Sequence, residues 1–498
     1  MKKITNCFTL FFLPYIMLNA QVTPAQVKTL DAYIEKAMND WQTPGLAVVI
    51  CKDGKEILSK GYGIRELGKP DKVDTKTIFS CASTTKAMTA VAMGILVDEG
   101  KIKWSDKVTQ HLPTFKVGDP YLTNELTIKD LFTHNGGMGN ADFLWSYSDL
   151  NSDQILETFA QIKPSYSLRG GYTYQNIMYL VAGKVIEKIS GSPWRDFVKR
   201  RIFDPLSMTR TFSTLKASQV ERNRSRPHDR VAGMTMPIED SVVDECDAAG
   251  SVWSCVEDMS KWMRFMLDST RINGKALLSA ATYGELFKPQ ALVPLAGFYP
   301  TATLTKPNWM TYGLGWFQHD YKGKMVQFHT GSLAGTVAIH GLIPSEKLGI
   351  YVFGNLDHTE VRHALMYRVF DLFLNEKERD WSVEFKNLYD GFRIQTEKLQ
   401  KQKESERILN TKPSLSLAKY TGVYTDPIYG NADVFEEKGQ LKIRWSSQLS
   451  MTLDHWHFDT FKGIYNKVWI PADMVSFVLN EEGKVVKMQS GGASWGRK

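Results

Sequence analysis

The chain has 498 residues and a formal net charge of +7, which falls to +5 once Lys2 and Lys3 leave with the leader described below. So small a charge on so long a chain gives no argument for nucleic-acid binding, which relies on clustered basic residues. After residue 20, no apolar run reaches the roughly 18 residues that a membrane-spanning helix needs, so no transmembrane segment is expected.

The first 20 residues have the order of a signal peptide. Lys2 and Lys3 precede an apolar stretch from Phe8 to Leu18, and Asn19-Ala20 follow it. Because the stretch is too short to span a bilayer, residues 1–20 are predicted to be a cleaved leader. The mature protein is then secreted or periplasmic.

Four cysteines remain after the leader: Cys51, Cys81, Cys246 and Cys255. In an oxidising compartment, a Cys246–Cys255 disulfide is one arrangement and four buried free thiols are the other. Spacing alone does not decide between them.

The mature chain opens with an amphipathic helix pattern and a hairpin. Apolar residues recur at helical spacing at Val27, Leu30, Ile34 and Met38. Two β-like runs, 46–51 and 56–60, then flank Lys52-Asp53-Gly54-Lys55. An Asp-Gly pair between two such runs is a strong signal for a tight hairpin.

Ser83 and Lys86 form a Ser-x-x-Lys pair at the start of a long apolar run. At the first turn of a helix, residues three apart share a face, so the lysine amine lies near the serine hydroxyl. A serine needs a base to become a nucleophile, and a partly desolvated lysine can be that base. The alternative is a helix-capping serine with a solvated lysine. Ser213/Lys216 and Ser416/Lys419 match the pattern too, but neither begins a segment of helical length.

Tyr174-Gln175-Asn176 follows the turn-like Arg169-Gly170-Gly171 and precedes another apolar helix pattern. A phenol and an amide two residues apart on a loop can point together into a cleft. Tyr429-Gly430-Asn431 has the same spacing, so the pattern is weak by itself.

His329-Thr330-Gly331 lies between two β-rich runs, 325–328 and 336–339. The glycine would let a ligand backbone approach the edge of the strand closely. The alternative for His329 is a hydrogen-bonded histidine at a strand end, since most histidines are not catalytic.

The arrangement of these elements predicts an α+β fold. Helical patterns dominate from Ser83 to about Asp268, strand patterns return from Gly313 to Asn355, and a helix-like segment runs from Glu360 to Leu374. Strands at both ends with helices between them indicate one antiparallel sheet flanked by helices, beside an all-helical region.

Two further segments complete the chain. Residues 377–412 are dense in charge with spaced apolar residues, which predicts a charged amphipathic helix used as a linker. Residues 413–498 carry short β runs with turns, which predicts a small all-β, barrel-like domain with its own core.

Other catalytic and metal-binding patterns lack the context they need. We interpret Gly492-Ala493-Ser494-Trp495-Gly496 as a tail, because a nucleophile elbow needs a helix after it. His455-x-His457 lacks a third ligand nearby, and neither His-Glu-x-x-His nor Cys-x-x-Cys occurs, so no metal and no cofactor is expected.

Taken together and in this order, the motifs at Ser83, Tyr174 and His329 resemble the active-site signature of the penicillin-recognising serine hydrolases. The class C β-lactamase branch, with its DD-peptidase, D-aminopeptidase and esterase relatives, is the most similar. The stretches 126–134, 248–254 and 312–316 are similar to that family as well. The resemblance covers about residues 24–376, and residues 413–498 resemble a β domain of unknown function that often follows such enzymes.

The resemblance implies roles for these residues. Ser83 would be acylated and then released by water, with Lys86 and Tyr174 as base and proton shuttle in an order that the sequence leaves open. Asn176, His329, Thr330 and Gly331 would contact the substrate. The backbone N–H groups of Ser83 and Ser332 would form the oxyanion hole.

The sequence therefore predicts an exported serine hydrolase acting on esters or amides of small molecules or short peptides. Two alternatives stay open: a non-turnover penicillin-binding or sensing protein, and a DD-carboxypeptidase or D-aminopeptidase. No arginine, the best ligand for a free carboxylate, occurs between Arg271 and Arg362. That window instead offers aromatic residues for an apolar group: Phe298, Tyr299, Trp309, Tyr312, Trp316 and Phe317. The competing interpretation places these aromatics in the core and gives the carboxylate to a lysine or a distant arginine.

Overall fold

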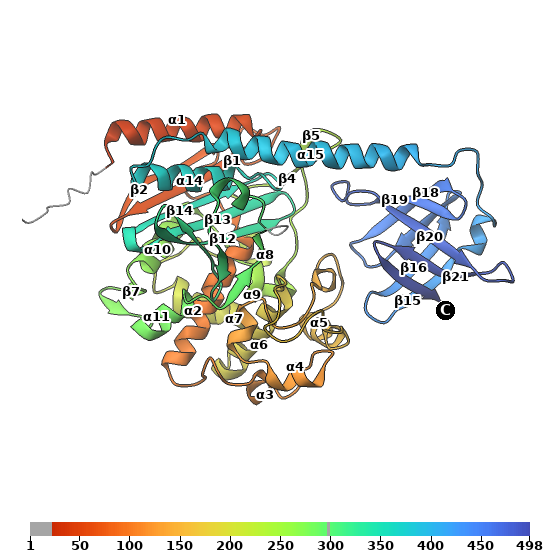
Figure 1. The fold of residues 1–498 in the computed structure, drawn as a ribbon, viewed down its shortest axis with the longest axis horizontal. Coiled ribbons are helices and arrows are strands. Elements are labelled where there is room, and N and C mark those ends of the chain that lie inside the picture. Colours follow the sequence, from red (N-terminus) through yellow and green to blue (C-terminus); the bar gives the residue numbers. More distant parts are fainter. Residues whose placement is uncertain (1–21, 296–298) are drawn as a thin grey trace, which may run out of the picture.

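The computed structural model describes residues 22–295 and 299–498. The predicted signal peptide at 1–20 and Phe298 lie outside the described residues. A sheet covered by helices and a mainly helical region form the larger part of the molecule, and a long helix, α15 (Trp381–Ser405), leads from it to a C-terminal barrel (Figure 1).

One antiparallel sheet brings the two ends of the larger part together. Its strand order is β2-β1-β14-β13-β12-β11-β10-β9, so the N-terminal hairpin pairs with a strand some 300 residues later. The strands are β1 (Gly45–Lys52), β2 (Lys55–Gly63), β9 (Ala291–Val293), β10 (Met310–Tyr312), β11 (Phe317–Tyr321), β12 (Lys324–Leu333), β13 (Thr336–Ile343) and β14 (Leu348–Gly354). The predicted sheet of distant segments is confirmed.

Strand β1 is apolar from Gly45 to Cys51 because helices cover both faces of the sheet. Leu46, Val48 and Ile50 belong to the core under α1 (Pro24–Asp40) and α14 (Val361–Phe373). The alternating residues Ala47, Val49 and Cys51 belong to the core shared with α10 (Val256–Leu267) and the helical region. Successive side chains of a strand point to opposite faces, and here both faces are buried.

The predicted hairpin at Asp53-Gly54 is present. Both residues have positive φ angles, 51° and 75°, which is the backbone of the two-residue turn that matches the twist of paired strands. Strands β1 and β2 pair from Gly45↔Gly63 to Lys52↔Lys55.

The helical region lies between β2 and β9 in the sequence, together with short strand pairs. Its helices are α2 (Thr85–Asp98), α3 (Val108–His111), α4 (Pro120–Glu125), α5 (Ser152–Phe159), α6 (Asn176–Ser190), α7 (Trp194–Val198), α8 (Leu215–Ser218), α9 (Asp247–Gly250) and α11 (Ala280–Leu286). The short strands are β3 (Phe79–Ser80) with β6 (Trp253–Ser254), β4 (His228–Val231) with β5 (Met234–Pro237), and β7 (Arg271–Ile272) with β8 (Lys275–Ala276). Helix α13 (Ala302–Thr305) follows between β9 and β10.

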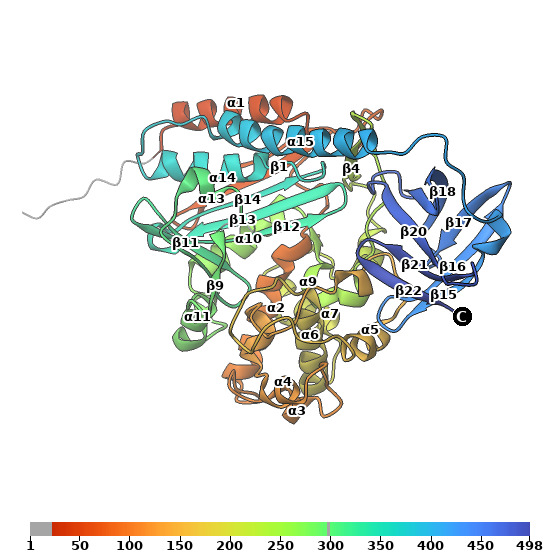
Figure 2. The same ribbon diagram turned by 45° about the vertical axis from the view of Figure 1, so that its right-hand side comes forward.

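The charged helix α15 is anchored at its start. Trp381 and Phe385 are buried against α14, and the rings of Trp381 and Phe385 stack at 5.3 Å. The remainder of the helix is mostly exposed and extends toward the barrel (Figures 1 and 2).

The C-terminal strands form a closed barrel around an apolar core. They follow chain order: β15 (Gly422–Asp426), β16 (Gly430–Glu437), β17 (Gln440–Arg444), β18 (Ser450–His457), β19 (Thr460–Tyr465), β20 (Asp473–Leu479), β21 (Val485–Ser490) and β22 (Ala493–Arg497). Reading the last residues as a tail was wrong, because β22 pairs with both β15 and β21 and closes the barrel. The predicted fold class, α+β followed by a small all-β barrel, is confirmed.

All four cysteines of the described chain are free and buried, so the Cys246–Cys255 disulfide is absent and the alternative of four thiols holds. Among the helices of residues 22–295 and 299–498, none has the length and apolar character needed to cross a membrane.

Candidate active site

Ser83 lies in a tight 3₁₀ turn, Ala82–Thr84, that leads directly into α2 at Thr85. The preceding Ala82 has a φ of 46°, a left-handed conformation that costs a non-glycine residue about 1–2 kcal/mol. The sequence placed Ser83 in the first turn of the helix itself. In the structure, the turn just before the helix presents the serine to a cavity of about 570 Å³.

Strand β12 packs against this turn at Gly331. A Cβ atom added at Gly331 would lie 2.2 Å from the carbonyl oxygen of Cys81, which is closer than any real contact. The glycine expected to admit a ligand therefore admits the backbone of the turn that carries Ser83, and it sets the distance between the two walls of the cavity.

Lys86 is completely buried beneath Ser83. Its Nζ donates to Ser83 Oγ at 3.1 Å, to Asn176 Oδ1 at 2.6 Å and to the carbonyl oxygen of Ala249 at 2.9 Å. Burial without a carboxylate partner lowers the pKa of Lys86 to about 7. The amine can therefore hold or release a proton near neutral pH.

Tyr174 stands on the loop before α6, with its ring over the Lys86 amine at 4.8 Å. Burial raises the pKa of Tyr174 well above its usual value, and a hydrogen bond with Ser83 opposes that rise. The phenol is thus protonated at neutral pH and contacts Ser83. His134, 4.3 Å from the Tyr174 ring, accepts a hydrogen bond from the backbone N–H of Gln175 and holds this loop.

Asn176 begins α6 and lies between Lys86 and a carboxylate. Its Oδ1 accepts from Lys86, while its Nδ2 donates to Asp142 Oδ1 at 2.9 Å. The side chain predicted to contact a substrate amide therefore also orients the lysine, although it still lines the cavity.

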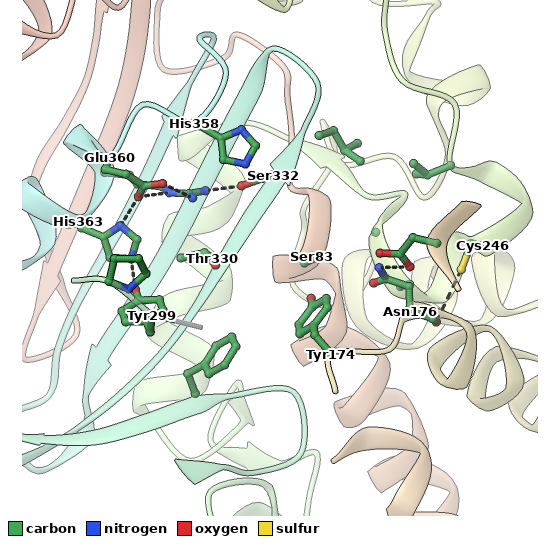
Figure 3. Close-up of a pocket in the computed structure, with 18 of the residues that line it drawn as sticks. Ser83, Tyr174, Asn176, Cys246, Tyr299, Thr330, Ser332, His358, Glu360 and His363 are labelled. Carbon is green, nitrogen blue, oxygen red and sulfur yellow. Dashed lines mark hydrogen bonds and ion pairs between the residues drawn. The ribbon is translucent and has the colours of Figure 1, made fainter. Parts of the chain in front are cut away.

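The opposite wall is the end of β12, where Thr330 and Ser332 line the cavity (Figure 3). His329 is only 1% exposed and lies in the aromatic layer behind them. Its Nε2 meets the Tyr312 hydroxyl at 2.8 Å and its Nδ1 meets the carbonyl oxygen of Thr330 at 2.6 Å. Burial and the nearby Lys86 lower the pKa of His329 to about 3, so its imidazole is neutral.

A second polar group borders the cavity at the start of α14. Arg362 donates to the carbonyl oxygen of Gly331 and, at 2.8 Å, to Ser332 Oγ, while its Nε and Nη2 bind both carboxylate oxygens of Glu360. His363 joins Glu360 at 2.5 Å and also contacts the Tyr299 hydroxyl. Figure 3 shows this group on the strand side, facing Ser83 and Tyr174 across the cavity.

The sequence profile of the family described as Beta-lactamase matches residues 30–372. The chain belongs to the Beta-lactamase family. A domain of unknown function, DUF3471, matches residues 406–492.

Similar proteins match most of the chain. The unguisins hydrolase ungD of Aspergillus violaceofuscus is 26% identical over 86% of this chain and 81% of its own length. Protein flp of Staphylococcus aureus is 26% identical over 76% and 72%, respectively. The octameric penicillin-binding protein homologue of Pyrococcus abyssi has the same fold, with a TM-score of 0.60, 19% identity and coverage of 93% of this chain and 98% of that one. SurE follows with a TM-score of 0.58, 17% identity and coverage of 95% and 99%.

The fold brings Ser83, Lys86, Tyr174, Asn176, Thr330 and Ser332 together, and places His329 and Gly331 directly behind. Sequence reasoning missed Asp142 and the Glu360–Arg362 pair, which no local pattern marks. Of the predicted aromatic window, Tyr299 and Phe317 line the cavity, Tyr312 and Trp316 are core, and Trp309 is 58% exposed. Arg362, the first arginine after the arginine-free window, lines the cavity itself.

Proposed function

We propose that the chain is an exported serine hydrolase that cleaves ester or amide bonds through an acyl-enzyme on Ser83. The observation that carries this proposal is a fully buried Lys86 whose amine lies 3.1 Å from Ser83 Oγ and has a pKa lowered to about 7. A purely structural lysine would gain nothing from burial without a counter-charge, because desolvating an ammonium costs free energy.

In the proposed reaction, neutral Lys86 accepts the proton of Ser83 as Oγ attacks the substrate carbonyl carbon. The backbone N–H groups of Ser83 and Ser332 bind the resulting oxyanion. Tyr174, which remains protonated at neutral pH, passes a proton from Lys86 to the leaving group as the carbon–heteroatom bond breaks. Water then attacks the acyl-enzyme as Lys86 takes its proton. The bond between the acyl carbon and Oγ breaks, Lys86 returns the proton to Ser83 Oγ, and the acid is released.

This assignment of base and shuttle rests on the two pKa directions. A phenolate base at Tyr174 would have to form against a raised pKa, whereas Lys86 is already partly neutral near pH 7. General base catalysis is most effective when the pKa lies near the working pH.

The substrate class is an ester or amide of a small molecule or short peptide. Beside its polar groups the cavity offers three aromatic side chains, Trp145, Tyr299 and Phe317, which suit an apolar substrate group. The relative named for hydrolysis of unguisins supports hydrolytic turnover over stable acylation.

The test is acylation and turnover in one experiment. A fluorophosphonate probe followed by peptide mass spectrometry should place the adduct on Ser83, and steady hydrolysis of p-nitrophenyl butyrate should continue beyond one equivalent of enzyme. An adduct on Ser213 or Ser332 would refute the assignment of Ser83 as the nucleophile. One-equivalent acylation without turnover would favour the penicillin-binding or sensing alternative.

A further inference from the structure

The catalytic cavity continues into a second cavity of about 390 Å³, within the range of ligand sites. Trp145, Ser332, Leu333 and His358 line both. Ser332 is the proposed oxyanion-hole residue, so a substrate bound at the reacting centre lies at the entrance to the outer cavity.

The C-terminal barrel builds the far wall of this outer cavity. Gln448, Trp469, Ile470 and Pro471 contribute from the barrel, while Tyr147 and Val242 contribute from the larger domain. The opening is therefore formed by two domains, a common position for ligand sites. Figure 2 shows the barrel standing beside the helical region at this point.

Specific contacts fix the barrel in this position. Ser447 bonds through its N–H and hydroxyl to both carboxylate oxygens of Asp149, at 2.7 and 2.6 Å. Trp469 Nε1 donates to the Tyr147 hydroxyl at 3.2 Å, and Lys467 pairs with Glu239.

The loop that the barrel holds also reaches the catalytic residues. Trp145, two residues before Tyr147, donates through Nε1 to Asp142 Oδ1 at 2.9 Å, and the same carboxylate oxygen accepts from Asn176. Phe143 packs on Tyr429 of the barrel with ring centroids 4.3 Å apart. The barrel thus borders the substrate path and supports the loop that forms its inner side.

The chemistry of the outer cavity selects its occupant. Its walls are largely aromatic and aliphatic, with Trp145, Trp469 and Leu333 facing a common space. Two carboxylates, Asp229 and Asp357, also line the cavity. His358 pairs with Asp357, and Asp229 disfavours an anionic group. An uncharged apolar side chain fits these walls.

Resting on the proposed function, we propose that the barrel forms the outer half of the substrate site and that Trp469 binds an apolar group of an extended, peptide-like ester or amide. The enzyme then prefers long, uncharged substrates over small esters, and the barrel provides that preference.

The test compares Trp469→Ala with Val468→Ala in the full chain. Val468 is the neighbouring residue, is 55% exposed, and lies outside the cavity wall, so it is a matched control. The substrates are p-nitrophenyl acetate, an N-blocked tripeptide p-nitrophenyl ester that is long on the acyl side, and an N-acetylated tripeptide amide that is long on the leaving-group side.

For at least one long substrate, we expect Trp469→Ala to lower kcat/KM by about ten-fold or more while p-nitrophenyl acetate hydrolysis stays unchanged and Val468→Ala behaves as wild type. Equal effects of Trp469→Ala on short and long substrates, or none on any, would overturn the inference. So would a wild-type enzyme that hydrolyses the small ester without preferring either long one. Absence of all turnover in the wild type would instead refute the proposed function.

Tyr147→Phe separates contact from support, because it removes the hydrogen bond to Trp469 but keeps both rings. We expect it to retain most of the long-substrate preference. A loss as large as that of Trp469→Ala would show that the indole acts only by positioning the loop, which contradicts direct binding.

Discussion

The two domains fill their interiors differently. The larger domain buries Lys86, His329, Glu360 and Arg362 around its cavity. Among the described residues of the barrel, Ser490 is the only buried polar side chain apart from tyrosines, and the core of the barrel is apolar. Burying polar groups costs free energy unless every partner is supplied, so their concentration around one cavity supports the proposed active site there.

The comparison also separates two uses of a polar contact. Around Ser83, polar groups are held in place and desolvated, which shifts their pKa values. At the domain boundary, Ser447 and Asp149 are exposed and join one domain to the other. The first kind should control rate and the second should control selectivity, and the following predictions test this division.

Ser83→Ala should have the largest effect on rate. Removing the proposed nucleophile should lower ester hydrolysis by at least about a thousand-fold and abolish probe labelling. The melting temperature should not fall, because Ser83 is only partly buried. Steady-state kinetics and calorimetry on the same preparation check both, and a large fall in melting temperature would show that Ser83 is structural.

Lys86→Met should lower acylation by about 10²–10⁴-fold, the range of general base catalysis. In the wild type, acylation should rise with pH and level off above about 7, because only the neutral amine accepts a proton. Stopped-flow acylation across pH measures this. A pH profile of acylation that stays flat would exclude Lys86 as the base. The double variant Lys86→Met/Tyr174→Phe should lose less than the sum of the two single losses in activation free energy, because the two groups act as one unit.

The same variant predicts a pH dependence of stability. The folded pKa of Lys86, about 7, lies below its unfolded value, so folding releases a proton, and the wild type gains stability as pH rises from about 7 to about 10. The melting temperature of Lys86→Met relative to wild type should therefore be higher near pH 7 than near pH 9. An unchanged difference would mean that the amine is not desolvated.

Gly331→Ala should impair both stability and rate, since its Cβ would meet the Cys81 carbonyl oxygen at 2.2 Å. We expect a loss of about 1–3 kcal/mol of unfolding free energy and about 100-fold in rate from displaced walls. Gly439→Ala in a barrel turn is the control: its φ of 75° makes it strained but nothing lies within 4 Å. It should cost about 1 kcal/mol and leave activity intact.

Neutral esters or blocked amides should exceed peptides with a free D-Ala carboxylate by at least about ten-fold in kcat/KM, or roughly 1.4 kcal/mol. Arg362 places a guanidinium at the cavity, but its Nε and Nη2 already bind the carboxylate of Glu360. Glu360→Gln weakens that pairing, frees Arg362 for a substrate carboxylate, and should reduce the preference for neutral substrates. A wild-type preference for the free carboxylate would place the enzyme in the carboxypeptidase branch.

Truncation after Lys412 should have the smallest effect on a small ester. All residues around Ser83 precede that point, so p-nitrophenyl acetate turnover should stay close to wild type while hydrolysis of long substrates falls. Complete loss of small-ester turnover in a folded truncation, judged by circular dichroism, would show that the barrel supplies part of the reacting centre.

Much of the fold could be predicted because its signals are local. The Asp53-Gly54 turn, the apolar run of β1 and the charged helix before the barrel each depend on neighbouring residues, as does the nearness of Lys86 to Ser83. The last strand was misread because β22 is identified only by its pairing with β15 and β21. Strand β15 lies far from β22 in the sequence, and the two pair only when the barrel closes.

The sequence by itself determined that Lys86 lies beside Ser83 and fixed the order of the motifs, since spacing of three residues at a helix start leaves little freedom. Tertiary structure decided which groups surround them. Asp142, Glu360 and Arg362 reach the cavity because loops and α14 return to the end of β12, and Gly331 packs against the turn that carries Ser83. Burial, which sets the pKa of Lys86, exists only once these distant segments pack together and exclude water.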